Sequence, residues 1–143
     1  MLGLSQLCGH LWRGLARDLQ DAEPRLAHSS LRRAVTAACL CVSRARFDAV
    51  GGFDAERFPV TLNDIDLCLK LEAAGGVNIY CATAEAYHLE GESRGADDDL
   101  AKAARRHTEL LAFSRTWRGE DGQIGDPWLP PSLSRAGERG APR

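Results

Sequence analysis

The sequence predicts a mixed α/β domain, and three observations lead to this fold class. An unbroken apolar run at residues 35–42 is typical of a buried strand. Residues 63–74 have the apolar spacing of an amphipathic helix, and residues 97–117 have that of a longer one. The chain has 143 residues, which at about 100–200 residues per domain is one domain or part of one.

Composition and charge exclude several classes of protein. Lysine and arginine number 18, aspartate and glutamate 20, so the formal charge is −2. Without a basic excess, nucleic-acid binding by a charged surface is disfavoured. Hydrophobic residues make up 44% and charged residues 27%, as in soluble globular chains. No apolar run approaches the ~20 residues of a transmembrane segment.

The cysteines indicate the compartment. There are five, with no CxxC pair and no zinc-ligand spacing. We therefore expect free thiols in a reducing cytoplasm. Cys39 and Cys41 alternate within the apolar run and Cys68 falls on a helical stripe, so we expect all three to be buried as small hydrophobes. The N-terminus lacks the basic leader of a signal peptide.

Three zones of different composition divide the chain. Residues 1–34 are mixed and predict an irregular lead-in of loop and short helix. Residues 35–117 carry the regular structure. Residues 118–143 are rich in glycine, proline and arginine, and we expect an extended, partly disordered tail.

The first elements of the middle zone are a strand and a short helix. Residues 35–42 are small or β-branched, which predicts a strand covered on both faces. Residues 44–50 suit a short helix that Gly51 and Gly52 end, because glycine adopts the left-handed conformation at little cost. A turn is expected at Phe53 and Asp54.

The clearest helix follows at residues 63–74. Asn63 is a good N-cap, and Asp66 stands three positions later, as in a capping box. Asp64 and Asp66 also complement the positive end of the helix dipole. Gly75 and Gly76 end the helix. Its predicted buried stripe is Leu67, Cys68, Leu71 and Ala74.

Two extended pieces and a long helix complete the zone. Residues 77–81 alternate as a strand, and residues 85–88 suit a second short extended piece. Residues 97–99 begin a helix that runs to Trp117, with Arg105, Arg106 and Glu109 expected outside. Its predicted apolar side is Leu100, Ala103, Ala104, Leu110, Leu111, Phe113 and Trp117.

One group of polar residues could carry chemistry. Asp64 and Asp66 open a helix upstream of His88, and carboxylates with an imidazole are what a divalent cation or a proton transfer needs. Glu90, Ser93 and Arg94 follow, but these are common loop residues. Acids in a first helical turn also stabilise the helix by ~0.3–1 kcal/mol without any further role. A histidine at a strand end is more often structural, so spacing alone leaves both interpretations open.

The order of motifs resembles a known family. The motifs occupy residues 35–40, 47–54, 63–69, 87–90 and 93–95. Residues 126–134 resemble a final motif that is common in the same family. Together they resemble the C-terminal half of family 2 glycosyltransferases of the Rossmann-like GT-A fold, and in particular bacterial rhamnosyltransferase-like enzymes of surface-polysaccharide synthesis. The likeness covers roughly residues 9–134. It implies a partial GT-A fold, the acceptor-side half, with a few strands and flanking helices.

The resemblance implies roles for individual residues. Asp64 matches the general base that takes the proton from the acceptor hydroxyl, and Asp66 the second acidic position, which supports the site or orients the acceptor. His88 matches a histidine that approaches the metal and the diphosphate of the donor. The residues implied in substrate binding are Gly51, Gly52, Phe53, Asp54, Asn63, Asp66, Glu90, Ser93 and Arg94.

The resemblance also implies cofactors and partners. A divalent cation, Mg²⁺ or Mn²⁺, would stabilise the departing diphosphate in the parent enzyme. The partners would be a nucleotide-sugar donor, plausibly of a deoxyhexose, and a glycan or lipid-linked acceptor. The implied location is cytoplasmic, or peripheral at the inner face of the membrane.

The chain departs from the family pattern in three places. Ala37 stands where the family usually has glycine, and residues 81–83 replace a stretch that usually contains proline. No Asp-x-Asp motif precedes Val35, although the family keeps that motif and its nucleotide pocket in the N-terminal half. We therefore expect a fragment that turns over poorly alone and has a separately encoded N-terminal half as a partner.

Two other classes of function stay open. The chain could be a non-catalytic remnant that acts as a small binding or interaction module, with Asp64 and Asp66 kept for stability. A metal-binding regulatory domain built on cysteine and histidine is weaker, because the thiols fall on apolar stripes.

Overall fold

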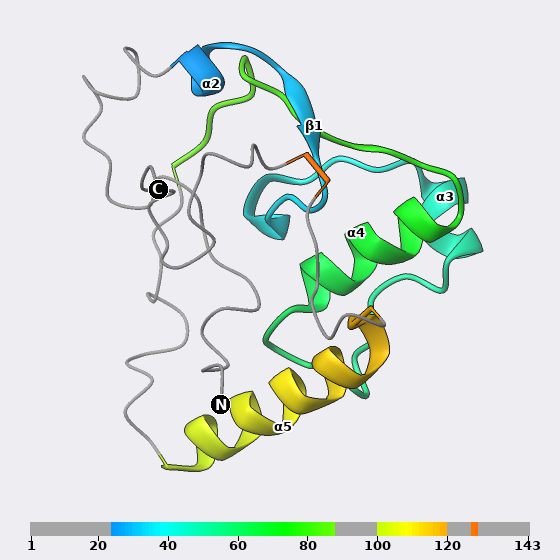
Figure 1. Ribbon diagram of the computed structural model, residues 1–143, viewed down its shortest axis with the longest axis vertical. Helices are drawn as coiled ribbons and strands as arrows, with labels where there is room; N and C mark the ends of the chain where they lie inside the picture. Colours follow the sequence, from blue (N-terminus) through cyan, green and yellow to red (C-terminus); the bar gives the residue numbers. More distant parts are fainter. Residues whose placement is uncertain (1–23, 88–99, 120–126, 129–143) are drawn as a thin grey trace.

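The computed structural model describes residues 24–87, 100–119 and 127–128 (Figure 1). The described chain runs through a short helix, a strand, a 3₁₀ turn, two helices, a second strand and a long helix. In order, these are α2 (Pro24–Ala27), β1 (Ser30–Arg32), η2 (Ala37–Cys39), α3 (Arg44–Ala49), α4 (Asn63–Ala73), β2 (Asn78–Tyr80) and α5 (Leu100–Trp117).

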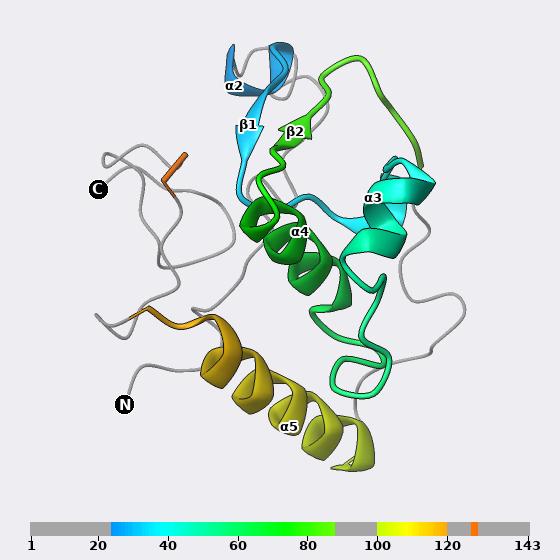
Figure 2. The same ribbon diagram turned by 90° about the vertical axis from the view of Figure 1, so that its right-hand side faces the viewer.

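Helix α4 lies at the centre of the described structure, between the strand pair and α5 (Figures 1 and 2). Strands β1 and β2 pair antiparallel, with Leu31 opposite Ile79. The side chain of Asn78 ties the pair to the helix, because its Nδ2 donates to the carbonyls of Cys68 (3.0 Å) and Arg33 (2.9 Å). The chain is therefore mixed α/β, as predicted.

The hydrophobic core joins α4 to α5 through the loop that precedes α4. Its buried members are Phe58, Leu62, Leu69 and Phe113, and Ile65, Leu110, Ala112 and Trp117 pack against them. The rings of Phe58 and Phe113 meet edge to face at 5.9 Å, a favourable geometry for aromatic pairs. This core fixes α5 relative to the start of α4.

Most of the helical predictions are confirmed. Gly51 and Gly52 end α3 as predicted, with φ of 79° and 62°. Its N-cap is Ser43, which was not predicted and which accepts from the N–H of Arg46 at 3.3 Å. Gly75 ends α4 with φ of 80°. Strand β2 lies within the predicted residues 77–81, and α5 ends at Trp117 as predicted. The predicted start of the long helix at residues 97–99 lies outside the described residues. Within the described ranges, none of the helices combines the length and the hydropathy that a membrane crossing needs.

The predicted buried strand at residues 35–42 is wrong. Residues 37–39 form a 3₁₀ turn, and Cys39 and Cys41 are exposed. Thr36 begins the turn, because its Oγ1 accepts from the N–H of Ala38 at 3.3 Å. The N–H of Ala37 donates to the side chain of Asp64 at 3.1 Å rather than to a neighbouring strand. The small side chains offer little apolar area, so these polar contacts determine the local conformation.

The strand that pairs with β2 is instead β1, in the segment where we expected loop and short helix. Residues 85–87 form no strand, and His88, the end of that predicted piece, lies outside the described residues. In α4 the predicted stripe is buried at Leu67, Cys68 and Leu71, but Ala74 is exposed.

Several further predictions about α4 and α5 are wrong. The N-cap of α4 is Leu62, with no side-chain capping bond, and Asn63 is already the first helical residue. Asp66 does not complete a capping box, since its side chain bonds elsewhere. In α5, four members of the predicted apolar side are exposed, namely Leu100, Ala103, Ala104 and Leu111. Glu109, expected outside, is instead 2% exposed.

Candidate functional site

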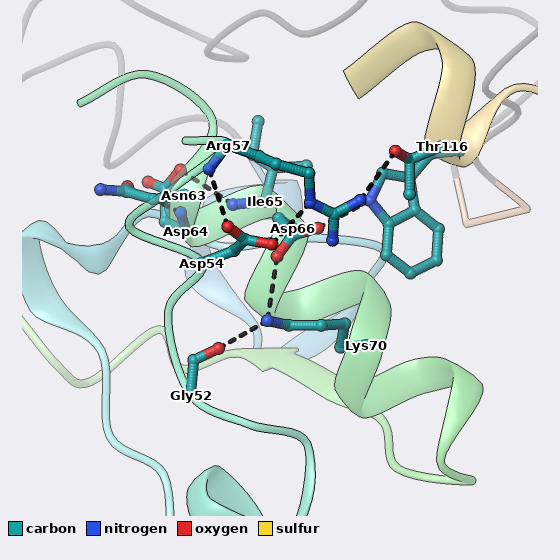
Figure 3. Close-up of polar contacts among 10 residues, drawn as sticks. Gly52, Asp54, Arg57, Asn63, Asp64, Ile65, Asp66, Lys70 and Thr116 are labelled. Atoms are coloured by element: carbon teal, nitrogen blue, oxygen red, sulfur yellow. Dashed lines mark hydrogen bonds and ion pairs between the residues drawn. The ribbon is translucent and has the colours of Figure 1, made fainter. Parts of the chain in front are cut away.

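The candidate site is the start of α4, where Asp64 and Asp66 point to opposite sides (Figure 3). Residues two apart on an α-helix are rotated by about 200°, so the two carboxylates cannot share one face. Asp66 is fully buried, and Asp64 is half-buried. The two acids therefore have different environments.

Asp66 is the centre of a buried polar group that joins three segments. Its Oδ1 accepts from the indole Nε1–H of Trp117 at 2.9 Å. Its Oδ2 lies 3.0 Å from Nζ of Lys70, as an ion pair without hydrogen-bond geometry. Lys70 in turn donates to the carbonyl of Gly52 at 2.6 Å. Asp66 thus ties α4 to the end of α5 and, through Lys70, to the turn after α3.

Asp64 is held by uncharged backbone donors. Its Oδ2 accepts from the N–H of Ala37 at 3.1 Å and its Oδ1 from the N–H of Ile65 at 2.9 Å. Both contacts come from backbone N–H groups rather than from side-chain cations. Asn63 lies beside it and accepts from the N–H of Asp64 at 2.8 Å. These hydrogen bonds of Asp64 within the described residues therefore involve no side-chain cation.

Leu62, directly before α4, has a strained backbone. Its φ is 66°, the left-handed conformation, and it is the one non-glycine residue with positive φ among the described residues. This conformation costs a non-glycine residue roughly 1–2 kcal/mol. The carbonyl of Leu62 still accepts from the N–H of Asp66 at 2.8 Å and begins the helix. Strain of this kind is concentrated at functional sites and persists only where neighbours enforce it.

The turn after α3 carries the predicted residues Gly51, Gly52, Phe53 and Asp54. A Cβ on Gly52 would meet the ring of Phe47 at 2.7 Å, and φ of Gly52 is 62°, so any other residue would have to move that ring and adopt a left-handed backbone. Phe53 is 44% exposed.

Asp54 is engaged by the loop that follows it. It accepts from the N–H of Arg57 at 2.8 Å and from its Nε at 2.6 Å. These hydrogen bonds, the backbone one first, lower the pKa of Asp54. Arg57 also donates to Thr116 of α5 at 3.3 Å and so holds this loop against α5.

A second buried carboxylate holds the same loop. Oε2 of Glu109 accepts from the N–H of Thr61 at 2.5 Å, and its Oε1 lies 3.4 Å from Nε of Arg105. Glu109, Lys70 and Trp117 were not among the predicted site residues. Lys70 could have been found as the i+4 partner of Asp66, whereas nothing in the sequence indicates the partner of Trp117 or of Glu109.

The structure brings part of the predicted site together. The start of α4 and the turn at residues 51–54 are joined by Lys70. The other predicted residues, His88, Glu90, Ser93 and Arg94, lie outside the described residues, so their roles stay predictions. A hollow of about 220 Å³ does exist on α5, but its lining residues, Lys102, Ala103, Arg106, His107 and Leu110, were not predicted in the site.

The described residues do not provide a cation site. In residues 24–87, 100–119 and 127–128, no group of three or more His, Cys, Asp or Glu side chains could hold a metal ion. Asp66 is already paired with Lys70, which leaves Asp64 as a single carboxylate at this place. The divalent cation predicted for the parent enzyme stays a prediction.

Searches against known proteins place the chain beside four curated sequences. No protein-family model matches it, and no solved structure matches it. A protein of Sinorhizobium fredii called uncharacterized protein y4gI is 46% identical over 101 residues, which are 71% of this chain and 11% of that protein.

Two other relatives carry functional names. The O-antigen biosynthesis protein RfbC of Myxococcus xanthus is 37% identical over 138 residues, 94% of this chain and 10% of that protein. An N-acetylglucosaminyl-diphospho-decaprenol L-rhamnosyltransferase of Mycobacterium tuberculosis is 40% identical over 77 residues, 54% of this chain and 25% of that protein. The chain thus spans a quarter or less of these relatives, and it is similar to glycosyltransferase-related proteins.

Proposed function

We propose that the chain is the acceptor-side part of a family 2, GT-A glycosyltransferase. The proposed reaction transfers a sugar, such as a deoxyhexose, from a nucleotide diphosphate to a hydroxyl of a glycan or lipid-linked acceptor. The observation that carries the proposal is the similarity to two relatives with named roles, one covering 94% of the chain and one that transfers rhamnose. The order of the sequence motifs supports the proposed C-terminal position in the parent enzyme.

Asp64 is the general base of the proposed reaction. Its carboxylate takes the proton from the acceptor hydroxyl while that oxygen forms a bond to the anomeric carbon. The bond from the anomeric carbon to the diphosphate breaks, and the nucleotide diphosphate leaves with that electron pair. In the described part of the chain Asp64 accepts only from backbone N–H groups, which supports its availability to a hydroxyl.

Asp66 has a positioning role in the same proposal. It is fully buried and paired, so it supports the start of α4 rather than touching the acceptor. The turn at residues 51–54, joined to Asp66 through Lys70, forms the acceptor side. No step is assigned to the predicted cation, because the described residues offer it no ligand set.

The proposed partners are those of a longer protein. They are a nucleotide-sugar donor, a glycan or lipid-linked acceptor and a separate N-terminal half that binds the nucleotide. We propose a cytoplasmic location, at the inner face of the membrane where a lipid-linked acceptor would be presented.

A chimeric enzyme tests the proposal. The full 143-residue chain is inserted into the Mycobacterium tuberculosis rhamnosyltransferase so that its 77 aligned residues take the place of the matching residues of that enzyme. Transfer of rhamnose to the acceptor in that enzyme's name is then measured. We expect turnover in the chimera, and a loss of ~10²–10⁴-fold in kcat for Asp64→Asn, as for removal of a positioned general base. Asp48→Asn is the matched control, because Asp48 lies on α3, exposed and paired with Arg44.

The same experiment discriminates against the alternative, a non-catalytic binding or interaction module. The contact from Asp64 to the N–H of Ala37 favours that alternative, since it gives the carboxylate a structural task. Full turnover in Asp64→Asn would refute the base assignment and support the structural role. A folded chimera without any transfer would also count against the proposal.

A further inference from the structure

Glu109 occupies a position on α5 where the helix faces the core. It is 2% exposed and lies four residues before Phe113, a fully buried core residue. An apolar side chain would be the usual occupant of such a position. Its Oε2 instead accepts from the backbone N–H of Thr61, 48 residues away in the sequence. The buried carboxylate is therefore directed at the loop before α4.

Thr61 directly precedes the strained residue at the start of α4. Leu62 has φ of 66° and is 9% exposed, and Asn63 and Asp64 follow it. A leucine leaves the left-handed conformation unless its neighbours hold it. On one side Thr61 is held by Glu109, and on the other the carbonyl of Leu62 is held by the N–H of Asp66. Hydrogen bonds thus hold the backbone on both sides of the strained residue Leu62.

We infer that Glu109 is a positioning residue for the candidate base. By holding the N–H of Thr61, Glu109 keeps Leu62 in the left-handed conformation and sets the direction in which the chain enters α4. That direction determines where the carboxylate of Asp64 points. The catalytic half of this inference rests on the proposed function, whereas the conformational half, Glu109 holding Leu62, is independent of it.

A double-mutant cycle in the full 143-residue chain tests the conformational half. We expect Glu109→Ala to raise the equilibrium constant of unfolding by about 10- to 100-fold, as for loss of a buried hydrogen bond to a charged group. In a Leu62→Gly background the same change should cost clearly less, because glycine adopts positive φ without support. Leu62→Ala is the matched background, since it loses the side chain but keeps the Cβ that causes the strain.

The cycle can overturn the inference. An equal effect of Glu109→Ala in the glycine and alanine backgrounds would mean that Glu109 does not hold the left-handed residue. If the glycine variant does not fold, amide hydrogen exchange decides. The amides of Thr61 and Asp64 should then exchange at least about 10-fold faster in Glu109→Ala than in wild type. Unchanged exchange at both amides would overturn the inference, and the exposed Glu56→Gln serves as the control.

Kinetics in the chimera test the catalytic half. We expect Glu109→Ala to lower kcat by about 10-fold or more with little change in KM, because the base is misdirected and not removed. Glu109→Gln should restore most of kcat, since its amide oxygen still accepts from the N–H of Thr61. Full kcat in Glu109→Ala beside an inactive Asp64→Asn would overturn the positioning role alone. Full kcat in Asp64→Asn would instead overturn the proposed function, and the stability cycle would still judge the conformational half.

Discussion

Replacing Asp66 with alanine should destabilise the protein more than any exposed acid would. The change removes the acceptor of the Trp117 N–H bond and the partner of Lys70. Asp66 is 0% exposed, so water cannot take over these contacts without entering the core. This substitution tests the stability of the fold and not a catalytic step.

The magnitude follows from the two broken contacts. Removal of one partner of a buried ion pair typically costs about 3–5 kcal/mol. Lys70 is 20% exposed on its side chain and keeps the carbonyl of Gly52, which places the expected cost near the lower limit, about 3 kcal/mol. Trp117→Phe breaks only the indole bond and leaves Oδ1 of Asp66 without that donor, so its expected cost is about 1–3 kcal/mol.

Urea unfolding followed by the fluorescence of the tryptophans measures both effects, with circular dichroism to check the fold. The control is Asp48→Ala, whose ion pair with Arg44 lies on side chains that are 53% and 87% exposed. Such pairs contribute about 0.2–1 kcal/mol. A cost for Asp66→Ala as small as that of Asp48→Ala would refute the claim that the buried group holds α4 to α5.

Two further predictions concern the turn between α3 and α4. Gly52→Ala should lower the free energy of unfolding more than Gly51→Ala does, as measured by thermal unfolding. Both glycines have positive φ, but only a Cβ at position 52 would meet Phe47, at 2.7 Å. We expect a loss of about 1 kcal/mol for Gly51→Ala and of at least about 2 kcal/mol for Gly52→Ala, and equal losses would contradict the packing argument. The bonds from Arg57 lower the pKa of Asp54 below the ordinary aspartate value of 3.8. This carboxylate therefore contributes stability above pH 3.8 and loses it as the pH falls through the lower folded pKa. The unfolding midpoint of Asp54→Asn should therefore fall less steeply than that of wild type below pH 3.8, and parallel curves would show that Asp54 contributes nothing.

Local signals in the sequence located the helices well. Gly51, Gly52 and Gly75 end α3 and α4 because glycine takes positive φ there, and this requirement can be read from a single sequence. The apolar spacing of residues 63–74 and 97–117 also predicted α4 and α5, of which the structure describes Asn63–Ala73 and Leu100–Trp117. These features depend on residues close to one another in the chain.

Contacts between distant residues explain what the sequence could not predict. The apolar run at residues 35–42 looked like a strand, but its backbone bonds to Asp64, which lies 27 residues after Ala37. Glu109 was expected on the surface, because its hydrogen bond to Thr61 joins residues 48 positions apart and cannot be read from the local sequence. The buried leucine with positive φ at position 62 likewise depends on such contacts. Of the candidate site, the start of α4 was predictable, and so was Lys70 as the i+4 partner of Asp66, whereas the contacts from Trp117 and Glu109 were not.

The contacts of the two buried carboxylates should depend little on ionic strength. Asp66 and Glu109 are at most 2% exposed, so dissolved ions approach them poorly and screen their contacts little. Added salt should weaken exposed pairs such as Arg44 with Asp48, while α5 keeps its place on α4. The attachment of α5 to the start of α4 should therefore depend little on the salt concentration.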